Sequence, residues 1–270
     1  MIARRGLIAL LAAGAAACST DTAPPDNGPV STVLLKDVEI ATLPSPFYHF
    51  EYDVHGRVIN VSYASGFYVY DYHYAANRLS EVRSSILANN DRLVYSYDNA
   101  GRAAEVGYVD SMGVEYARVS LTYSGSKLVT LERSRLLGGV FVLEKTMAMT
   151  YDAEGNLVEL TEHLPAIDGH QTEATFVDRY AQYDTGINVD GFALIHDEFF
   201  DHLVLLPGVQ LQKGNPGTQV RTGDGLNFSI TYSYTYDSRN RPLSKTGQFT
   251  YDNGPDIGRV IQTSSLFSYY

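Results

Sequence analysis

The stretch Tyr52-Asp53-Val54-His55-Gly56 recurs along the chain and decides its fold. The other copies are Tyr97-Asp98-Asn99-Ala100-Gly101, Tyr151-Asp152-Ala153-Glu154-Gly155 and the near-copy Tyr236-Asp237-Ser238-Arg239-Asn240. Asp is favoured at the first position of a type I turn, and a following Gly supplies the positive φ of a three-residue hairpin loop. Asn also tolerates this conformation. Each copy therefore predicts a hairpin turn built on structural residues, which are Asp53, Gly56, Asp98, Gly101, Asp152, Gly155, Asp237 and Asn240.

The segments around these turns alternate in side-chain character. Before residue 75, one face of an extended chain carries Tyr68, Tyr70, Tyr72 and Tyr74, and the other carries Val69, Asp71 and His73. A period of two predicts β-strands, and aromatic residues suit a half-buried sheet. The segments that leave the turns, 58–63, 103–109 and 157–160, are predicted to be strands as well.

Shortened copies lie between the full ones, at 74–79 and 123–128. The tyrosines that begin successive copies are spaced 22 to 28 residues apart, at positions 52, 74, 97, 123 and 151. This spacing accommodates one hairpin and its return connection, and a regular spacing indicates a repeat architecture. We therefore expect an all-β fold, an antiparallel β-meander of repeated hairpins that forms a large curved or barrel-like sheet. The sequence alone does not distinguish an open sheet from a closed one.

The N-terminal residues predict export. Arg4 and Arg5 precede an apolar stretch, 6–17, which is shorter than the roughly 20 residues needed to cross a bilayer. Residues 1–17 are therefore predicted to be a signal peptide. The segment 18–31 is rich in Pro and polar residues and predicts a flexible tether, followed by a single β domain over 32–270.

Cys18 is the single cysteine of the chain, which excludes an intrachain disulfide. It follows Ala15-Ala16-Ala17 and resembles the lipobox of bacterial lipoproteins, although that family usually has Leu where this chain has Ala15. The resemblance implies that Cys18 is acylated and becomes the first residue of the mature protein. A lipid anchor would then hold the protein on the outer membrane, at its periplasmic face or at the cell surface.

The Tyr-Asp element resembles the YD repeats of bacterial RHS-type proteins, in which Gly is followed by Arg or Asn and then Leu. Arg57, Arg102, Asn156 and Leu157 match those positions. Signal, lipobox, tether and degenerate repeats together resemble lipoproteins of the Bacteroidota, some of which carry a domain of unknown function with a porin-like fold. The stretch 183–188 also resembles a Tyr-Asp-x-x-x-Asn-Pro element of those proteins, with Val189 in place of Pro. The resemblance implies an architecture and an exported location, and it brings no assigned reaction.

The segment 187–221 departs from the β rhythm, because its apolar residues do not alternate. We expect a short helix followed by a loop, which forms a plug or cap over one end of the sheet. Long non-repetitive insertions are often functional.

The formal net charge is −11, and the acidic residues are scattered singly. Such a surface repels nucleic acid and is typical of a soluble protein. Calcium needs 6 to 8 oxygen ligands, whereas each Tyr-Asp turn offers one carboxylate that its own backbone already engages. We expect neither a metal nor a cofactor.

The densest polar cluster is formed by His196, Asp197, Glu198, Asp201 and His202. Its spacing does not match a zinc helix, so a solvated face is favoured over a hydrolase site. Tyr-rich sheets bind sugars and peptides, because tyrosine combines an apolar ring with a polar tip. The sequence thus favours a non-enzymatic, lipid-anchored envelope protein with a structural role or a glycan or protein partner. An integral outer-membrane β-barrel, suggested by the aromatic stretch 267–270, and a hydrolase that uses 187–221 are the alternatives.

Overall fold

The computed structural model describes residues 33–84, 91–189, 194–197 and 202–270. These residues form eighteen β-strands and no α-helix. None of the described residues belongs to a helix that is long and apolar enough to span a bilayer. The strands are β1 (Leu35–Ile40), β2 (Tyr48–Tyr52), β3 (Val58–Tyr63), β4 (Tyr68–Ala75), β5 (Arg78–Ser84), β6 (Arg92–Tyr97), β7 (Ala103–Val109), β8 (Glu115–Ser124), β9 (Lys127–Leu137), β10 (Val140–Tyr151), β11 (Leu157–Leu164), β12 (Ala174–Ala181), β13 (Leu194–Asp197), β14 (His202–Leu205), β15 (Thr218–Gly223), β16 (Phe228–Tyr236), β17 (Pro242–Tyr251) and β18 (Val260–Tyr269).

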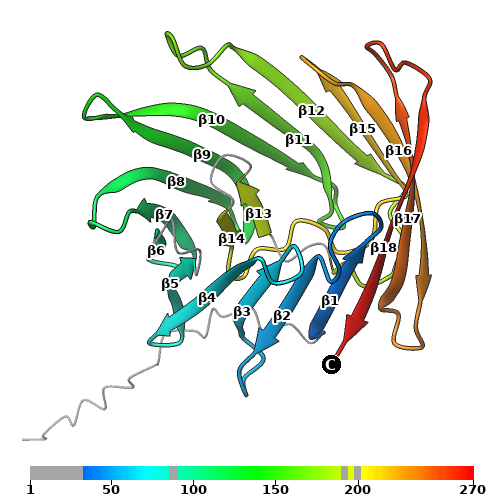
Figure 1. Cartoon of the computed structure of the whole chain (residues 1–270), viewed down its shortest axis with the longest axis horizontal. Coiled ribbons are helices and arrows are strands. Elements are labelled where there is room, and N and C mark those ends of the chain that lie inside the picture. The colour runs from blue at the N-terminus through cyan, green and yellow to red at the C-terminus, as the bar shows by residue number, and fades with distance from the viewer. Residues whose placement is uncertain (1–32, 85–90, 190–193, 198–201) are drawn as a thin grey trace, which may run out of the picture.

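Sixteen of these strands form a closed antiparallel barrel (Figure 1). Neighbours in the chain are neighbours in the barrel, except that β12 pairs with β15 across the insertion and β1 pairs with β18. The predicted meander of hairpins is therefore confirmed, and the sheet is closed rather than open. Closure satisfies the backbone groups that an open sheet would leave at its two edge strands.

The two faces of the barrel wall differ in polarity. On β4, Tyr70 and Tyr72 point inward and are buried, whereas Asp71 and His73 are exposed outside. The same alternation continues around the wall, where the exposed outward positions include Ser96, Thr122, Glu132, Arg179, Thr231, Ser233, Thr235 and Gln248. Because side chains alternate along a strand, one aromatic series faces the inside, while the outside carries Ser, Thr and charged groups together with exposed apolar side chains such as Val94, Val220 and Leu266.

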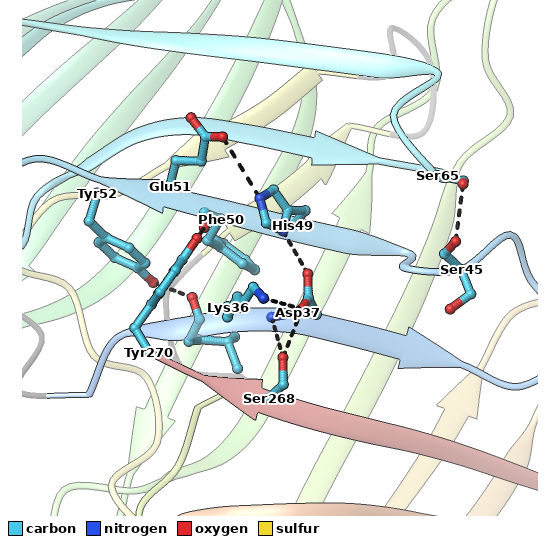
Figure 2. A network of polar contacts seen from close by, with 11 residues as sticks. Lys36, Asp37, Ser45, His49, Phe50, Glu51, Tyr52, Ser65, Ser268 and Tyr270 are labelled. Atoms are coloured by element: carbon cyan, nitrogen blue, oxygen red, sulfur yellow. Dashed lines mark hydrogen bonds and ion pairs between the residues drawn. The ribbon is translucent and has the colours of Figure 1, made fainter.

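A polar network holds the seam at which the two ends of the chain close the barrel (Figure 2). Asp37 on β1 accepts a hydrogen bond from Ser268 of β18 at 2.8 Å and lies 2.6 Å from Nδ1 of His49 on β2. The Tyr270 hydroxyl donates to the Phe50 carbonyl at 3.1 Å. These contacts join the consecutive strands β1 and β2 to β18, which lies more than 200 residues further along the chain.

The insertion between β12 and β15 differs from the expected short helix. Its described part contains the antiparallel hairpin β13–β14, in which Leu194 pairs with Leu205. β15 already begins at Thr218, so the break in the barrel meander covers 182–217 rather than 187–221. Figure 1 shows the hairpin inside the ring of strands, toward β5–β9. The described part of the segment therefore lies inside the barrel, as expected for a plug, but it contains a β-hairpin rather than a helix.

All the Tyr-Asp turns lie at one end of the barrel, because they follow alternate strands, namely β2, β6, β10 and β16. We call this the Tyr-Asp end and the opposite one the far end. The insertion leaves and re-enters the wall at the Tyr-Asp end, where β12 ends and β15 begins. Leu35, at the start of β1, pairs with Tyr269 at the same end.

Candidate functional site

The predicted turn residues adopt one shared geometry. In the second copy, Asp98 Oδ1 accepts hydrogen bonds from the backbone N–H groups of Ala100 and Arg102, both at 2.9 Å. The Arg102 guanidinium Nε donates to Asp98 Oδ2 at 2.8 Å, and Gly101 has a φ of +79°. The copies at Asp53, Asp152 and Asp237 repeat the backbone contacts, with Gly56, Gly155 and Asn240 at positive φ.

These contacts stabilise the ionised carboxylates. Hydrogen bonds from the backbone and the guanidinium of Arg102 hold the pKa of Asp98 below its usual value, and Arg241 does the same for Asp237. For Asp53, burial raises the pKa, but the hydrogen bonds from Arg57 and His55 outweigh it and lower the pKa overall. The carboxylates are thus engaged inside their own turns.

A ladder of tyrosines connects each repeat to the previous one. Each tyrosine hydroxyl donates to the backbone carbonyl of the first or second residue of an earlier strand; the pairs are Tyr52 to Leu35, Tyr74 to Val58, Tyr97 to Leu79, Tyr123 to Ala103, Tyr151 to Leu128, Tyr183 to Leu157 and Tyr269 to Pro242. The basic residue after a turn lies over the next tyrosine ring at 4.2 to 5.3 Å; the pairs are Arg57 with Tyr74, Arg78 with Tyr97, Arg102 with Tyr123, Lys127 with Tyr151 and Arg241 with Tyr269. This cation–π contact explains why a basic residue follows most of the turns.

The ladder changes where Asn156 replaces the basic residue. Asn156 Oδ1 accepts hydrogen bonds from the backbone N–H groups of Lys213 and Gly214, at 2.9 and 3.0 Å. A Cβ atom at Gly214 would lie 2.2 Å from the Asp184 carbonyl oxygen, so the close approach requires glycine. The substitution at position 156 therefore docks the insertion against the Tyr-Asp end.

The inner face of β2–β9 is a tightly packed wall, which we call the packed wall. Val61, Leu93 and Tyr108 are at most 1% exposed. The insertion covers this wall with Leu205 and Leu206, and the Tyr95 hydroxyl donates to the Leu205 carbonyl at 2.9 Å. Burial raises the pKa of Tyr95, so its hydroxyl remains a proton donor at neutral pH.

The inner face of β11, β12 and β15–β17 is less covered, and we call it the open wall. Its aromatic side chains are half-buried rather than buried. The Phe249 ring lies 4.6 Å from that of Phe228 and 4.9 Å, edge to face, from that of Tyr251. These rings present partly solvated apolar surface to the lumen.

Charged groups lie among these rings. Asp178 is 2% exposed and accepts hydrogen bonds from Arg221, whose Nη2 lies 2.6 Å from Asp178 Oδ2. Gln219 Nε2 also donates to Asp178 at 3.0 Å. The Arg221 guanidinium lies 5.4 Å from the Phe228 ring and 5.8 Å from the Phe176 ring. The hydrogen bonds to Asp178 raise the pKa of Arg221, and the two side chains form a bidentate, charge-assisted contact.

A second charged group lies further along the inner face, toward the far end. Glu144 is contacted by Arg133 Nη1 and by Arg135 Nε, each at 2.8 Å, and Lys145 pairs with Glu162 at 2.9 Å. Arg133 and Glu144 are buried. The interior therefore carries a band of paired charges from β9 to β15, in contrast to the apolar packed wall.

A pocket of about 250 Å³ lies at the Tyr-Asp side of the open wall. Barrel residues such as Leu160, Tyr232 and Lys245 form one part of its lining, and Leu211 and Pro216 of the insertion form another. The Lys245 ammonium lies 4.7 Å from the centroid of the Tyr232 ring. The pocket combines apolar surface with a small number of polar groups, as ligand sites commonly do.

The structure does not describe the side chains of the other residues singled out in the sequence. Cys18, Glu198 and Asp201 lie outside the described residues, and the side chains of His196, Asp197 and His202 are not described either. The backbone of β13–β14 pairs Asp197 with His202.

Sequence reasoning missed the interior charges and one turn. Asp178 lies two residues from both Phe176 and Tyr180 on β12, and Arg221 pairs with Asp178, so all four side chains face the same side of the sheet. A charged residue between two inward aromatic residues is the sequence pattern that could have indicated the interior charges. At the far end, Asp110 Oδ1 accepts from the backbone of Met112 and Val114 just as the Tyr-Asp turns do. That copy lacks the preceding tyrosine and was therefore not recognised.

No protein-family model and no curated protein sequence matches this chain. Solved structures do resemble it in fold, and two of them are crystal structures of porin-like proteins. A porin-like protein from Bacteroides uniformis has a TM-score of 0.57 at 12% identity, over 83% of this chain and 89% of that one. A porin-like protein from Bacteroides vulgatus has a TM-score of 0.57 at 14% identity, over 88% of this chain and 99% of that one. The expected porin-like β-barrel fold is therefore confirmed.

Proposed function

We propose that this chain is a lipid-anchored, non-enzymatic binding protein of the cell envelope, which holds its ligand inside the barrel. The observation that carries the proposal is the contrast between the two faces of the wall. The outward positions are rich in Ser, Thr and charged residues, whereas the open wall presents half-buried rings and a pocket to the lumen. A partner recognised by the aromatic and charged groups would therefore bind inside, not on the outer surface.

The lipid anchor rests on Cys18 and on the tether that precedes the domain. Acyl chains contribute about 0.8 kcal/mol per buried methylene, so several chains on one cysteine give stable attachment. β1 starts at the Tyr-Asp end, and the tether therefore leads to that end of the barrel.

Metabolic labelling with a fatty-acid analogue tests the anchor directly. We expect label on the wild-type chain and none on Cys18→Ala. Absence of label on the wild type would remove the anchor and, with it, the proposed attachment.

The alternative is an integral outer-membrane barrel, a location that the description of the two similar structures as porin-like would favour. Spanning barrels carry an outward apolar band about 25 Å tall. Asp71, Glu132 and Arg179 are exposed on the outer face here, which disfavours insertion. Carbonate extraction of Cys18→Ala distinguishes the two, because a tethered barrel is released into the supernatant whereas a spanning barrel stays in the pellet.

A further inference from the structure

The connecting loops at the two ends of the barrel expose different side chains. At the far end, large apolar side chains are exposed in or directly beside the loops; they are Leu43, Phe67, Met112, Val140, Leu226 and Ile257. Met112 is 83% exposed and Phe67 is 74% exposed. The described turns of the Tyr-Asp end are 53–57, 76–77, 98–102, 125–126, 152–156 and 237–241, and among them only Val54 is of this kind. One exposed apolar residue is ordinary, but a concentration of them at one end indicates an interaction surface.

The far-end loops project beyond the packed part of the barrel. A glycine with positive φ stands directly beside Phe67, Met112 and Ile257. A Cβ atom on any of these three glycines would meet no heavy atom within 4 Å outside the adjacent residues. The apolar side chains beside them therefore extend into the surroundings rather than pack against the wall.

These side chains are spread around the barrel rather than gathered in one patch. Val140 belongs to the β9–β10 hairpin and Ile257 to the β17–β18 hairpin, and β11, β12, β15 and β16 separate the two hairpins in the barrel. Figure 1 shows these hairpins on opposite sides of the ring of strands. A protein partner needs a contiguous area of roughly 800 Å² on this chain. The apolar layer of a bilayer is continuous, so it can receive side chains that lie far apart.

The charge of the far-end loops selects the kind of bilayer. The described loops are 41–47, 64–67, 110–114, 138–139, 165–173, 224–227 and 252–259. Their acidic residues are Asp110, Asp168, Glu173, Asp224, Asp252 and Asp256. These loops contain no lysine, and their arginine, Arg259, pairs with Asp256 at 3.3 Å. Anionic lipids attract basic segments and repel acidic ones, so the loops fit a zwitterionic surface.

The length of the tether allows the far end to meet the bilayer that would hold Cys18. About 15 residues separate Cys18 from Val33, the first described residue. An extended chain of that length spans at most roughly 50 Å. The longest strand, β10, has 12 residues. At about 3.3 Å per residue, such a strand is roughly 40 Å long. A tether that enters at the Tyr-Asp end can therefore run the length of the wall.

We propose that the far-end loops dock the barrel on a zwitterionic bilayer, with Phe67, Met112 and Ile257 inserted into its interfacial region. The wall itself stays in water, so the contact is peripheral. The inference goes beyond the proposed function and rests on it in one respect, which is that the lipid anchor keeps the loops close to the membrane. Because the anchor raises the effective concentration of the bilayer, a weak contact is sufficient.

Site-specific fluorescence locates the contact. The test uses the full chain carrying Cys18→Ala, so that no acyl group contributes to binding. Met112→Cys, Val54→Cys and the outer-wall substitution Thr231→Cys are each labelled with the polarity-sensitive fluorophore NBD. On addition of phosphatidylcholine vesicles, we expect a blue shift and a rise in intensity for Met112→Cys and neither change for the other two.

Vesicle flotation measures the affinity in the same Cys18→Ala background. Phe67→Ser/Met112→Ser/Ile257→Ser should weaken binding to phosphatidylcholine vesicles by about tenfold or more, because three apolar side chains no longer leave water. Val54→Ser removes an exposed apolar side chain from the opposite end and should leave binding unchanged. Vesicles that contain phosphatidylglycerol should bind the Cys18→Ala chain less tightly. Circular dichroism checks that each variant is folded.

Absence of a blue shift for Met112→Cys, or an equal shift for Val54→Cys, would overturn the inference. A shift for Thr231→Cys would also overturn it, because the wall would then enter the hydrocarbon as in a spanning barrel. A shift for Met112→Cys that grows with protein concentration without vesicles would assign the loops to a contact between copies of the chain. Fatty-acid labelling of the wild type reports on the anchor separately, so label without a vesicle-induced shift would remove the loop contact and leave the anchor.

Discussion

The packed wall and the open wall are built from the same alternating pattern of inward aromatic residues, yet they differ in burial. Leu93 on the packed wall is 1% exposed, whereas Phe249 on the open wall is half-buried. The difference comes from what lies opposite each wall. Leu205 and Leu206 of the insertion cover the packed wall. The open wall instead lines a pocket and carries part of the band of paired charges. The same strand pattern can therefore produce a dry core or a ligand-facing surface.

The largest expected change in the free energy of unfolding comes from truncating a phenylalanine, and one phenylalanine from each wall provides the comparison. Phe50 on β2 is 2% exposed, and Phe50→Ala should lower the free energy of unfolding by about 3–5 kcal/mol, because it leaves a cavity in close-packed surroundings. Phe249→Ala should cost clearly less, since its ring is already partly solvated. Urea unfolding of both variants measures the difference. Equal losses would mean that the two walls do not differ in packing.

The next comparison sets the interior ion pair against one on the outer face. Asp178→Asn leaves Arg221 without its carboxylate partner and should cost about 2–3 kcal/mol of unfolding free energy, since Asp178 is 2% exposed. Glu159→Gln breaks the exposed pair with Arg179 and should cost at most about 1 kcal/mol. Chemical denaturation measures both losses. An unchanged free energy of unfolding in Asp178→Asn would mean that the interior ion pair does not stabilise the barrel.

The turns are shared by both regions and should respond alike. Gly101 follows a packed-wall strand and has a φ of +79°, so Gly101→Ala should cost about 1 kcal/mol through backbone strain. Asn240 occupies the equivalent position after an open-wall strand with a φ of +63°. Asn240→Gly relieves the positive φ but removes the hydrogen bond from the Asn240 amide to the Thr185 carbonyl, 2.8 Å long, and should cost about 0.5–1.5 kcal/mol. Thermal unfolding measures both losses. An unchanged thermal stability of Gly101→Ala would show that the positive φ at this position is not required for a stable turn.

The smallest effect is the dependence of stability on pH. The folded pKa values of Asp98 and Asp237 lie below the ordinary value of 3.8, so their stabilisation is fully present above that value and is lost as the pH falls through the lowered pKa. The unfolding midpoint should therefore decline below about pH 4. The double variant Asp98→Asn/Asp237→Asn should show a shallower decline. An unchanged acid profile in that variant would argue against the turn contacts.

The sequence predicts the local parts of this fold well, because they are encoded locally. The carboxylate of Asp98 and the glycine at 101 specify a turn within a few residues, and the strands that follow at Val58–Tyr63 and Ala103–Val109 begin and end where the alternation indicates. The closed seam was not predictable, because Leu35 and Tyr269 carry no local sign that they pair.

The candidate site depends on contacts between residues that lie on either side of the insertion. No local pattern in the sequence reveals contacts between residues so far apart. Asp178 and Arg221 belong to strands separated by the 182–217 segment, and Leu211 reaches the pocket from that segment. The apolar residues at 194–205 lacked strict alternation, which favoured a helix. The pairing of Leu194 with Leu205 is a hairpin with few residues in each strand, too short for a period to show.

The openness of one side of the lumen is most directly tested by thiol labelling. Cys18 is the single cysteine, so a Cys18→Ala chain is a cysteine-free background for Leu93→Cys, Phe249→Cys and the outer-face control Thr231→Cys. With a water-soluble maleimide, the Phe249→Cys thiol should react in the folded state at a rate near that of Thr231→Cys, while Leu93→Cys stays protected until unfolding. Protection of Phe249→Cys equal to that of Leu93→Cys would contradict the account, because the open wall would then be closed to any ligand.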